Sequence, residues 1–228
     1  MIVQGMQGGV QKSLFAVVFE VQLNPSFADE YVRTAAALRP HLIQVEGFIR
    51  NERFRSRTGA HVLLSLSFWD NEKALVRWRS MAVHHHAQSK GRGGIFDDYH
   101  LRVGEVTRSS VRFTDRELGW MRHDATEVGR THALTIVETG SNTPRDPLGL
   151  VDELGGASGS ETYEHLDDPR HTLTLIERPG PDQEDKLFEA AMQANRPPWQ
   201  LYSLRIIRDY GLMDRREAPQ FRPPRARA

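Results

Sequence analysis

The chain has 228 residues, which is enough for one large or two small domains with a buried core. Its 30 basic side chains balance 30 acidic ones, so the net charge does not favour nucleic acid or an anionic membrane as a partner. It has no cysteine, which excludes disulfides and thiolate metal sites. Residues 1–11 lack the features of a signal peptide, and no apolar run is long enough to span a membrane. These observations predict a cytoplasmic protein with no nucleic-acid or membrane partner.

Hydrophobic patterning in the first half predicts a series of strands and helices. A β-branched and aromatic run predicts the first strand, and Asn24-Pro25-Ser26 ends it and caps a helix. Thr58-Gly59 lies between two alternating runs, as in a β-hairpin, and Asp70 caps a second helix. In chain order we expect a strand at 14–21, a helix from 27 to Pro40 or, after a kink, to Gly47, strands at 48–57 and 61–69, a helix at 71–90 and a strand at 99–107. This βαββαβ order is that of a ferredoxin-like unit.

The helix expected at 71–90 carries both an apolar stripe and three consecutive histidines. Leu75, Trp78 and His85 belong to a stripe with helical spacing, so we expect them to face the body of the protein. Consecutive helical residues point about 100° apart, so His84, His85 and His86 cannot all share one environment. A purely structural interpretation places them in the last turns of the helix, where the helix dipole favours imidazolium.

The second half of the chain repeats the pattern of the first. Glu52-Arg53, His61-Val62-Leu63 and Met81 correspond to Glu164-His165, His171-Thr172-Leu173 and Met192 at a nearly constant offset of 110 to 112 residues. A constant offset across several elements indicates a duplicated supersecondary unit. In the second unit we expect strands at 131–138, 160–165, 172–178 and 199–209, a helix at 183–194 and, in place of the long first helix, only a two-turn helix at 146–154.

These patterns divide the chain into a unit at 12–108, a connector at 109–130, a second unit at 131–213 and a tail at 214–228. The tail is expected to be disordered or to form a strap across a partner. Antiparallel sheets with helices on one face leave the other face open, so two units can pack their sheets together. The predicted fold class is α+β, with two tandem ferredoxin-like βαββαβ units, the second degenerate, forming an α+β barrel. Whether the units pack within one chain or between the chains of a homodimer stays open, and the barrel interior is expected to hold a small ligand.

Short motifs in the first unit occur at the spacing of a known family. They are Gly47-Phe48, Ser67-Phe68-Trp69 and Trp78-Arg79. Because of these motifs and their spacing, residues 12–108 resemble the antibiotic biosynthesis monooxygenase family of dimeric α+β barrels. The resemblance implies the barrel fold and one of several activities, namely cofactor-free oxygenation of quinols and anthrone-like polyketides, haem binding or degradation, or a non-oxidative reaction.

The cofactor-free reaction needs a dry cavity, a base and hydrogen-bond donors for an oxyanion. The resemblance to anthrone-oxidising relatives implies an Asn four residues before Trp69 and a Tyr shortly after it, where this chain has Ser65 and Leu75. Ser65 retains a donor, so the base is expected among the histidines. The predicted catalytic residues are His85, His84 and Ser65, and the predicted substrate-binding residues are Trp69, Trp78, His86, Gln88 and Phe96. The expected substrates are O₂ and an aromatic or quinol-like compound, with no cofactor.

Two alternatives to this function remain. Haem-degrading relatives use a histidine ten residues after Trp78, where this chain has Gln88, and an Asn on the first strand, which residues 14–23 lack. Haem binding therefore requires a displaced ligand, for which His85 is the candidate. The other alternative is a non-catalytic or regulatory barrel with a filled cavity. No metal site is predicted, because His84 and His86 diverge on a helix.

Some of these residues also have simpler interpretations. Trp69 and Trp78 can be core residues, because burying a tryptophan contributes about 4–6 kcal/mol by itself. Arg53, Arg55 and Arg57 alternate along the hairpin, which is most often a solvated face and less often a clamp for a carboxylated substrate.

Overall fold

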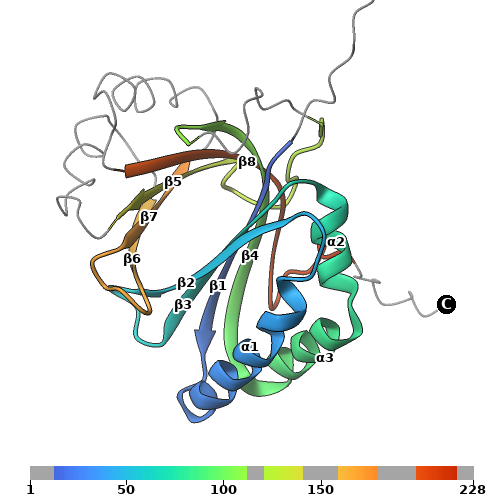
Figure 1. The fold of residues 1–228 in the computed structure, drawn as a ribbon, viewed down its shortest axis with the longest axis vertical. Helices are drawn as coiled ribbons and strands as arrows, with labels where there is room; N and C mark the ends of the chain where they lie inside the picture. The colour runs from blue at the N-terminus through green and yellow to red at the C-terminus, as the bar shows by residue number, and fades with distance from the viewer. Residues whose placement is uncertain (1–12, 112–120, 141–158, 179–198, 220–228) are drawn as a thin grey trace, which may run out of the picture.

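The computed structural model describes residues 13–111, 121–140, 159–178 and 199–219, in which eight strands close into one antiparallel barrel (Figure 1). Three helices pack along one side of it, against the strands of the first half (Figure 1). The elements are β1 (Phe15–Leu23), α1 (Ala28–Leu42), β2 (Phe48–Ser56), β3 (Val62–Trp69), α2 (Glu72–Ser80), α3 (Ala82–Lys90), β4 (Phe96–Ser109), β5 (Ala133–Thr139), β6 (Gly159–His165), β7 (Thr172–Arg178) and β8 (Trp199–Gly211).

Each half of the chain contributes four strands in the same order. β4, β1, β3 and β2 are neighbours in the first half, as β8, β5, β7 and β6 are in the second. Two seams join the halves. The long one pairs β4 with β8, and the short one pairs β2 with β6 through Phe54, Arg55 and Ser56. The predicted α+β barrel of two tandem units is confirmed, and it closes within a single chain.

Several expected elements fall where the structure gives no description. The second-half helices expected at 146–154 and 183–194, together with Met192, lie outside the described residues. In the first half, α1 continues through Pro40 and ends at Leu42. Among the helices that the structure describes, none combines the length and the apolar character needed to cross a membrane.

Strand alternation gives the sheet of the first unit two different faces. On β3, Leu64, Leu66 and Phe68 point into the barrel, where they join one apolar cluster with Ile136 and Leu204 of the second half. All five side chains are at most 1% exposed. The expectation of a ligand cavity inside the barrel is therefore wrong, because side chains from both halves pack together there.

The long helix expected at 71–90 is instead two helices. Met81 adopts φ −60° and ψ 134°, an extended conformation that ends α2 and precedes α3. Its amide still donates to the carbonyl of Arg77 at 3.1 Å. The apolar stripe of α2 does not continue past Met81, so the residues of α3 face directions that the uninterrupted helical pattern did not predict.

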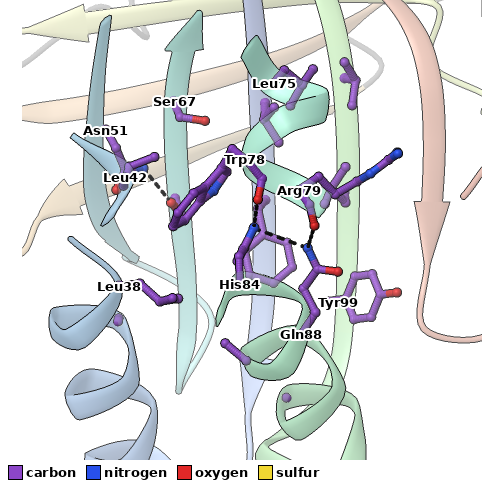
Figure 2. Close-up of a pocket in the computed structure, with 18 of the residues that line it drawn as sticks. Leu38, Leu42, Asn51, Ser67, Leu75, Trp78, Arg79, His84, Gln88 and Tyr99 are labelled. Atoms are coloured by element: carbon purple, nitrogen blue, oxygen red, sulfur yellow. Dashed lines mark hydrogen bonds between the residues drawn. The ribbon is translucent and has the colours of Figure 1, made fainter. Parts of the chain in front are cut away.

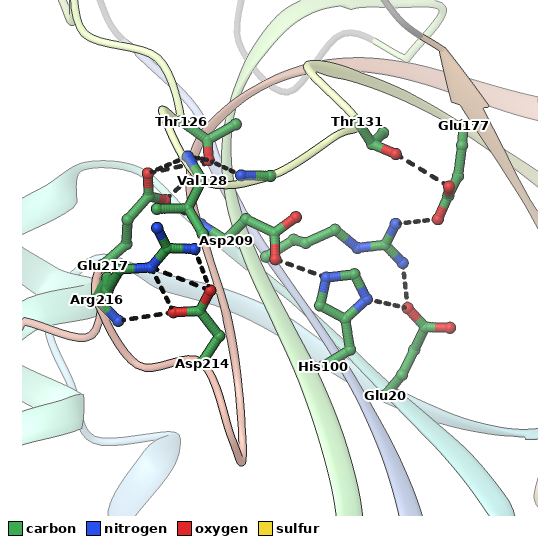
Figure 3. A network of polar contacts seen from close by, with 12 residues as sticks. Glu20, His100, Thr126, Val128, Thr131, Glu177, Asp209, Asp214, Arg216 and Glu217 are labelled. Carbon is green, nitrogen blue, oxygen red and sulfur yellow. Dashed lines mark hydrogen bonds and ion pairs between the residues drawn. The ribbon is translucent and has the colours of Figure 1, made fainter.

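An ion network around the buried Arg102 ties the two halves together near one end of the barrel (Figure 3). Arg102 on β4, only 1% exposed, donates to Glu177 of β7 at 2.7 Å and also pairs with Glu20 of β1. The Tyr163 hydroxyl of β6 donates to the other oxygen of Glu20 at 2.5 Å. Each charged group of this network thus has an oppositely charged or hydrogen-bonding partner, as burial of Arg102 requires.

The described part of the tail, residues 214–219, folds back on its own chain (Figure 3). The Glu217 carboxylate accepts hydrogen bonds from the amides of Val128 at 3.1 Å and Asp209 at 2.6 Å. It also accepts one from the Thr126 hydroxyl at 2.9 Å. We call residues 212–219 the strap, because they follow β8 and are fastened to the body of this chain, whereas residues 220–228 lie outside the described part.

Gly47 allows the close approach of the turn before β2 to the start of α2. Its φ is +89°, and an added Cβ would lie 2.3 Å from Asp70 Oδ1 and 2.8 Å from Ala74 Cβ. We therefore expect Gly47→Ala to lower the free energy of unfolding by about 2 kcal/mol or more in urea denaturation. Gly93→Ala is the matched control, since a Cβ there meets nothing within 4 Å. Equal midpoints for the two variants would contradict this account.

We expect Glu217→Ala to release the strap without unfolding the barrel. The amide of Asp209 loses the Glu217 carboxylate and that of Val128 keeps only Thr126 Oγ1 at 3.3 Å, so their hydrogen exchange should accelerate, by about tenfold or more at Asp209. Amide exchange followed by mass spectrometry or NMR measures this. Glu127→Ala removes a neighbouring exposed carboxylate as a control, and the same acceleration in that variant would show that Glu217 has no anchoring role.

Candidate active site

A cavity of about 250 Å³ lies between the outer face of the first unit's sheet and the three helices (Figure 2). Residues of β1 to β4 form its floor, and α1, α2 and α3 form the opposite wall. At one end, β8 and the strap contribute the remaining residues. The lining is mostly apolar and the volume is near the lower end for small-ligand pockets.

Two tryptophans expected to bind substrate line this pocket, Trp69 at the end of β3 and Trp78 on α2. Trp69 is 1% exposed and packs edge-on against Phe48 with ring centroids 5.3 Å apart. Its indole Nε1 donates to Ser67 Oγ at 2.9 Å. Both tryptophans therefore combine a core position with a place in the pocket wall.

His84 is held against this aromatic wall (Figure 2). Its ring stacks on the indole of Trp78, with centroids 4.2 Å apart and planes 18° from parallel. Its Nδ1 lies 3.0 Å from the carbonyl oxygen of Trp78, which at the end of α2 also accepts from the Met81 amide at 3.3 Å. A carbonyl can only accept, so we assign the proton to Nδ1, which leaves Nε2 with a free lone pair.

His84 stays neutral at physiological pH. Burial is the main cause that lowers its pKa to about 4, with a smaller contribution from the charge of His85, while the Trp78 carbonyl acts in the opposite direction. His84 also lies in the first turn of α3, the helix end at which the dipole disfavours a cation. The side chain is therefore available as a proton acceptor over most of the pH range.

Ser65 lies on the floor of the same pocket, and its hydroxyl is oriented by a neighbouring amide. Asn51 of β2 donates through Nδ2 to Ser65 Oγ at 2.8 Å and to the carbonyl of Leu66 at 3.1 Å. Because Ser65 Oγ is an acceptor in this bond, its own hydrogen is free to donate into the pocket. Ser67 has the same arrangement, since its oxygen accepts from Trp69. The floor thus offers two hydroxyl donors.

Gln88 and Phe96 also line the pocket, as predicted for substrate-binding residues. The Gln88 amide donates to the carbonyl of Arg79 at 3.4 Å, and its nitrogen lies 3.4 Å from His84 Nδ1. Phe96 packs edge-on against Phe19, with ring centroids 5.8 Å apart. Gln88 thus positions the end of α3 against α2, and Phe96 contributes apolar surface.

His85 and His86 are not part of this pocket. Both are exposed and neither lines the cavity. The expectation that His85 faces the body is wrong because it assumed an uninterrupted helix, whereas the break at Met81 turns His84 toward Trp78 instead. The three histidines also lie at the beginning of α3 and not in the last turns of a long helix.

Several pocket residues were missed by the sequence analysis. Asn51 and Ser67 were available from alternation, because they pair across the hairpin and share the helix-facing side with Ser65. Arg208 and Tyr210 of β8 and Arg215 of the strap also line the pocket. No local sequence signal connects them with the first unit, because that contact depends on how the barrel closes.

A second group of potential ligands lies elsewhere, at Glu52, Glu138 and His171, whose ligand atoms are within 4.8 Å of one another. Arg50 lies among them and pairs with Glu52 at 2.8 Å and with the buried Glu138 at 2.6 Å. A guanidinium therefore already pairs with both carboxylates, and we assign no metal to this group.

The described residues do not fit the alternative of a haem site. An axial ligand must direct an imidazole nitrogen into a cavity that admits the porphyrin. In His84 the ring stacks on Trp78 and Nδ1 binds a carbonyl. His85, the candidate for a displaced ligand, is exposed outside the cavity. Neither histidine is therefore placed to bind haem iron in this cavity.

Comparison with known proteins decides the family. The family model for antibiotic biosynthesis monooxygenase matches residues 14–90. A Pyricularia oryzae protein named jasmonate monooxygenase ABM is 36% identical over 231 residues, covering 92% of this chain and 99% of its own length. The chain belongs to the antibiotic biosynthesis monooxygenase family.

Two further similarities extend the comparison. The Bacillus subtilis protein YqjZ is 31% identical over 81 residues, which covers 36% of this chain and 69% of that protein. The crystal structure of an aldoxime dehydratase superposes with a TM-score of 0.52 at 7% identity, covering 86% of this chain and 82% of that one. The latter shows a similar fold alone. The family resemblance predicted from residues 12–108 is confirmed, and membership identifies this antibiotic biosynthesis monooxygenase as an oxidoreductase.

The lowered pKa of His84 predicts a pH-dependent stability in this family member. Between pH 6.5 and 4, the unfolded chain binds a proton at His84 that the folded protein does not, so the free energy of unfolding falls as the pH falls. The loss should reach about 2–3 kcal/mol by pH 4.5. Urea denaturation at pH 7 and pH 4.5 should show a smaller loss in His84→Gln than in the unchanged protein. Equal losses in both would mean that His84 titrates normally.

Proposed function

We propose that this protein is a cofactor-independent monooxygenase that uses O₂ to oxidise a small, largely apolar substrate with an acidic C–H group. The observation that carries the proposal is the neutral His84, with Nε2 unprotonated, in an apolar pocket that also contains the hydroxyls of Ser65 and Ser67. These groups supply the base and the oxyanion donors that the reaction needs.

The proposed reaction converts a CH₂ group beside a carbonyl or within a phenolic ring system into C=O. His84 Nε2 accepts a proton from the CH₂ group, and the resulting carbanion transfers an electron to O₂. Combination of the two radicals and return of the proton give a hydroperoxide. Loss of the second C–H proton with cleavage of the O–O bond then releases water. The balance is CH₂ + O₂ → C=O + H₂O, so no external reductant is required.

The low pKa of His84 limits which substrates can react. Proton transfer from a group with a pKa of about 10 to a base with a pKa of about 4 is uphill by about 8 kcal/mol. A turnover of about 10 s⁻¹ corresponds to a barrier of about 16 kcal/mol. The step is therefore feasible when the pocket stabilises the anion, and an unactivated C–H group is excluded as the site of deprotonation.

Ser65 and Ser67 are the proposed source of that stabilisation. Their oxygens accept hydrogen bonds from Asn51 and Trp69, so their hydroxyl hydrogens can point toward an enolate or phenolate oxygen on the substrate. Donors fixed in this way need little reorganisation when charge develops in a dry site. Asn51 and Trp69 act as positioning residues for the two hydroxyls.

Jasmonate is the first substrate to test, because the relative that covers nearly the whole chain is named for it. It is a cyclic ketone, and the C–H groups beside its carbonyl are much less acidic than a group with a pKa of about 10, so its deprotonation needs stronger stabilisation of the anion than that of an anthrone. An anthrone and a quinol complete the panel, since the apolar, aromatic pocket also suits flat rings.

We expect oxygen consumption with one member of this panel, with one atom from ¹⁸O₂ in the product, to persist after treatment with a chelator. His84→Ala should lower kcat by about 10²- to 10⁴-fold. His86→Ala is the matched control, because His86 is exposed outside the pocket. Unchanged turnover in His84→Ala would remove His84 from the mechanism, and loss of activity with the chelator would refute cofactor independence.

A further inference from the structure

The pocket carries a concentration of positive charge that the chain as a whole lacks. Six arginines line it: Arg39, Arg53, Arg79, Arg92, Arg208 and Arg215. The carboxylate that also lines it, Glu72, is already paired with Arg122 outside the lining at 2.8 Å. Within the described ranges, no ion pair to a carboxylate is formed by any of the six arginines.

Two of these arginines, Arg79 and Arg208, lie together at one end of the pocket. Arg208 and Tyr210 are two residues apart on β8, so they share the face that looks into the pocket, opposite Val103 and Leu101 of β4. Figure 2 shows the side chain of Arg79 directed toward β8 and away from His84. Burial is the main cause that lowers the pKa of Arg79, and the positive charge of Arg208 lowers it further, whereas Tyr210 and Glu72 act in the opposite direction.

Arg79 also has a donor that the described residues leave unused. Its Nε is buried and has no hydrogen-bond partner among them. A buried donor without a partner costs about 1–3 kcal/mol, and two like charges side by side add to the cost. An anionic group bound at this end would satisfy the donor and offset the repulsion between Arg79 and Arg208.

The surroundings of this pair suit a carboxylate. Tyr210 and Tyr99 add phenol groups to the same end of the lining, and Arg215 of the strap donates to the Tyr99 hydroxyl. By contrast, Arg53 donates to the carbonyl of Ala35 at 3.3 Å and Arg92 to Ser89 Oγ at 3.4 Å, so these cations are already engaged. A planar guanidinium binds a carboxylate through two parallel hydrogen bonds.

We propose that the substrate is a carboxylic acid whose carboxylate binds Arg79 and Arg208, so that the anion fixes which carbon of its apolar body faces His84. That the bound acid is a substrate rests on the proposed function. The carboxylate site itself can be tested by measuring binding alone. Arg79 and Arg208 are specificity-determining residues, supplied by α2 of the first half and β8 of the second.

Binding of a matched acid and ester tests the proposal independently of turnover. Jasmonic acid carries a negatively charged carboxylate at pH 7.5, whereas its methyl ester is neutral. Binding of both can be measured by titration calorimetry without O₂. We expect the acid to bind at least about tenfold more tightly than the ester. Arg79→Gln and Arg208→Gln should each weaken binding of the acid by about tenfold or more and change binding of the ester by less than about threefold.

Arg55→Gln is the matched control, because it removes the same charge from an exposed position outside the pocket. Circular dichroism of each variant identifies any that fails to fold, and either of the two pocket variants suffices for the test. Equal affinities for acid and ester, no binding of the acid, or equal losses for both ligands would overturn the carboxylate site. Selective binding of the acid without oxygen consumption would support the carboxylate site and refute the proposed reaction. Turnover of the ester without preference for the acid would support the proposed reaction and refute the carboxylate site.

Discussion

Closure of the barrel by the second half is the constraint on which the rest of the structure depends. A strand of the first unit has two faces, and the inner one becomes a packed core only because residues such as Ile136 and Leu204 fill the other side of it. The outer face is then left to the helices, and the pocket forms beneath them. Burying the apolar face in the barrel thus leaves the pocket on the opposite side of the same sheet.

The break at Met81 is the second feature that shapes the site. An uninterrupted helix would pair the carbonyl of Trp78 within its own hydrogen-bond ladder. With Met81 extended, this carbonyl accepts from the Met81 amide at 3.3 Å and also lies within hydrogen-bond distance of His84, and a new helix starts in a new direction. One residue therefore accounts for the orientation of the imidazole, whereas burial keeps it neutral.

Much of the fold could be predicted from the sequence, because strands and repeats are written in local patterns. The constant offset between the halves and the alternation on both sides of Thr58-Gly59 predicted the order of strands that the barrel has. The choice between His84 and His85 could not be predicted, since Met81 carries no local signal for a helix break. The contribution of Arg208 was equally hidden, because it depends on contacts about a hundred residues apart.

Having both units in one chain also affects how the sequence of such a protein can evolve. In a symmetric pair of identical units, any substitution appears in both, so a residue must serve its structural and its binding role at once. Here β8 and the strap contribute Arg208, Tyr210 and Arg215 to a pocket whose proposed base, His84, lies in the other half. Substrate preference can therefore drift through substitutions in the second half while His84, Trp78 and Ser65 are inherited unchanged.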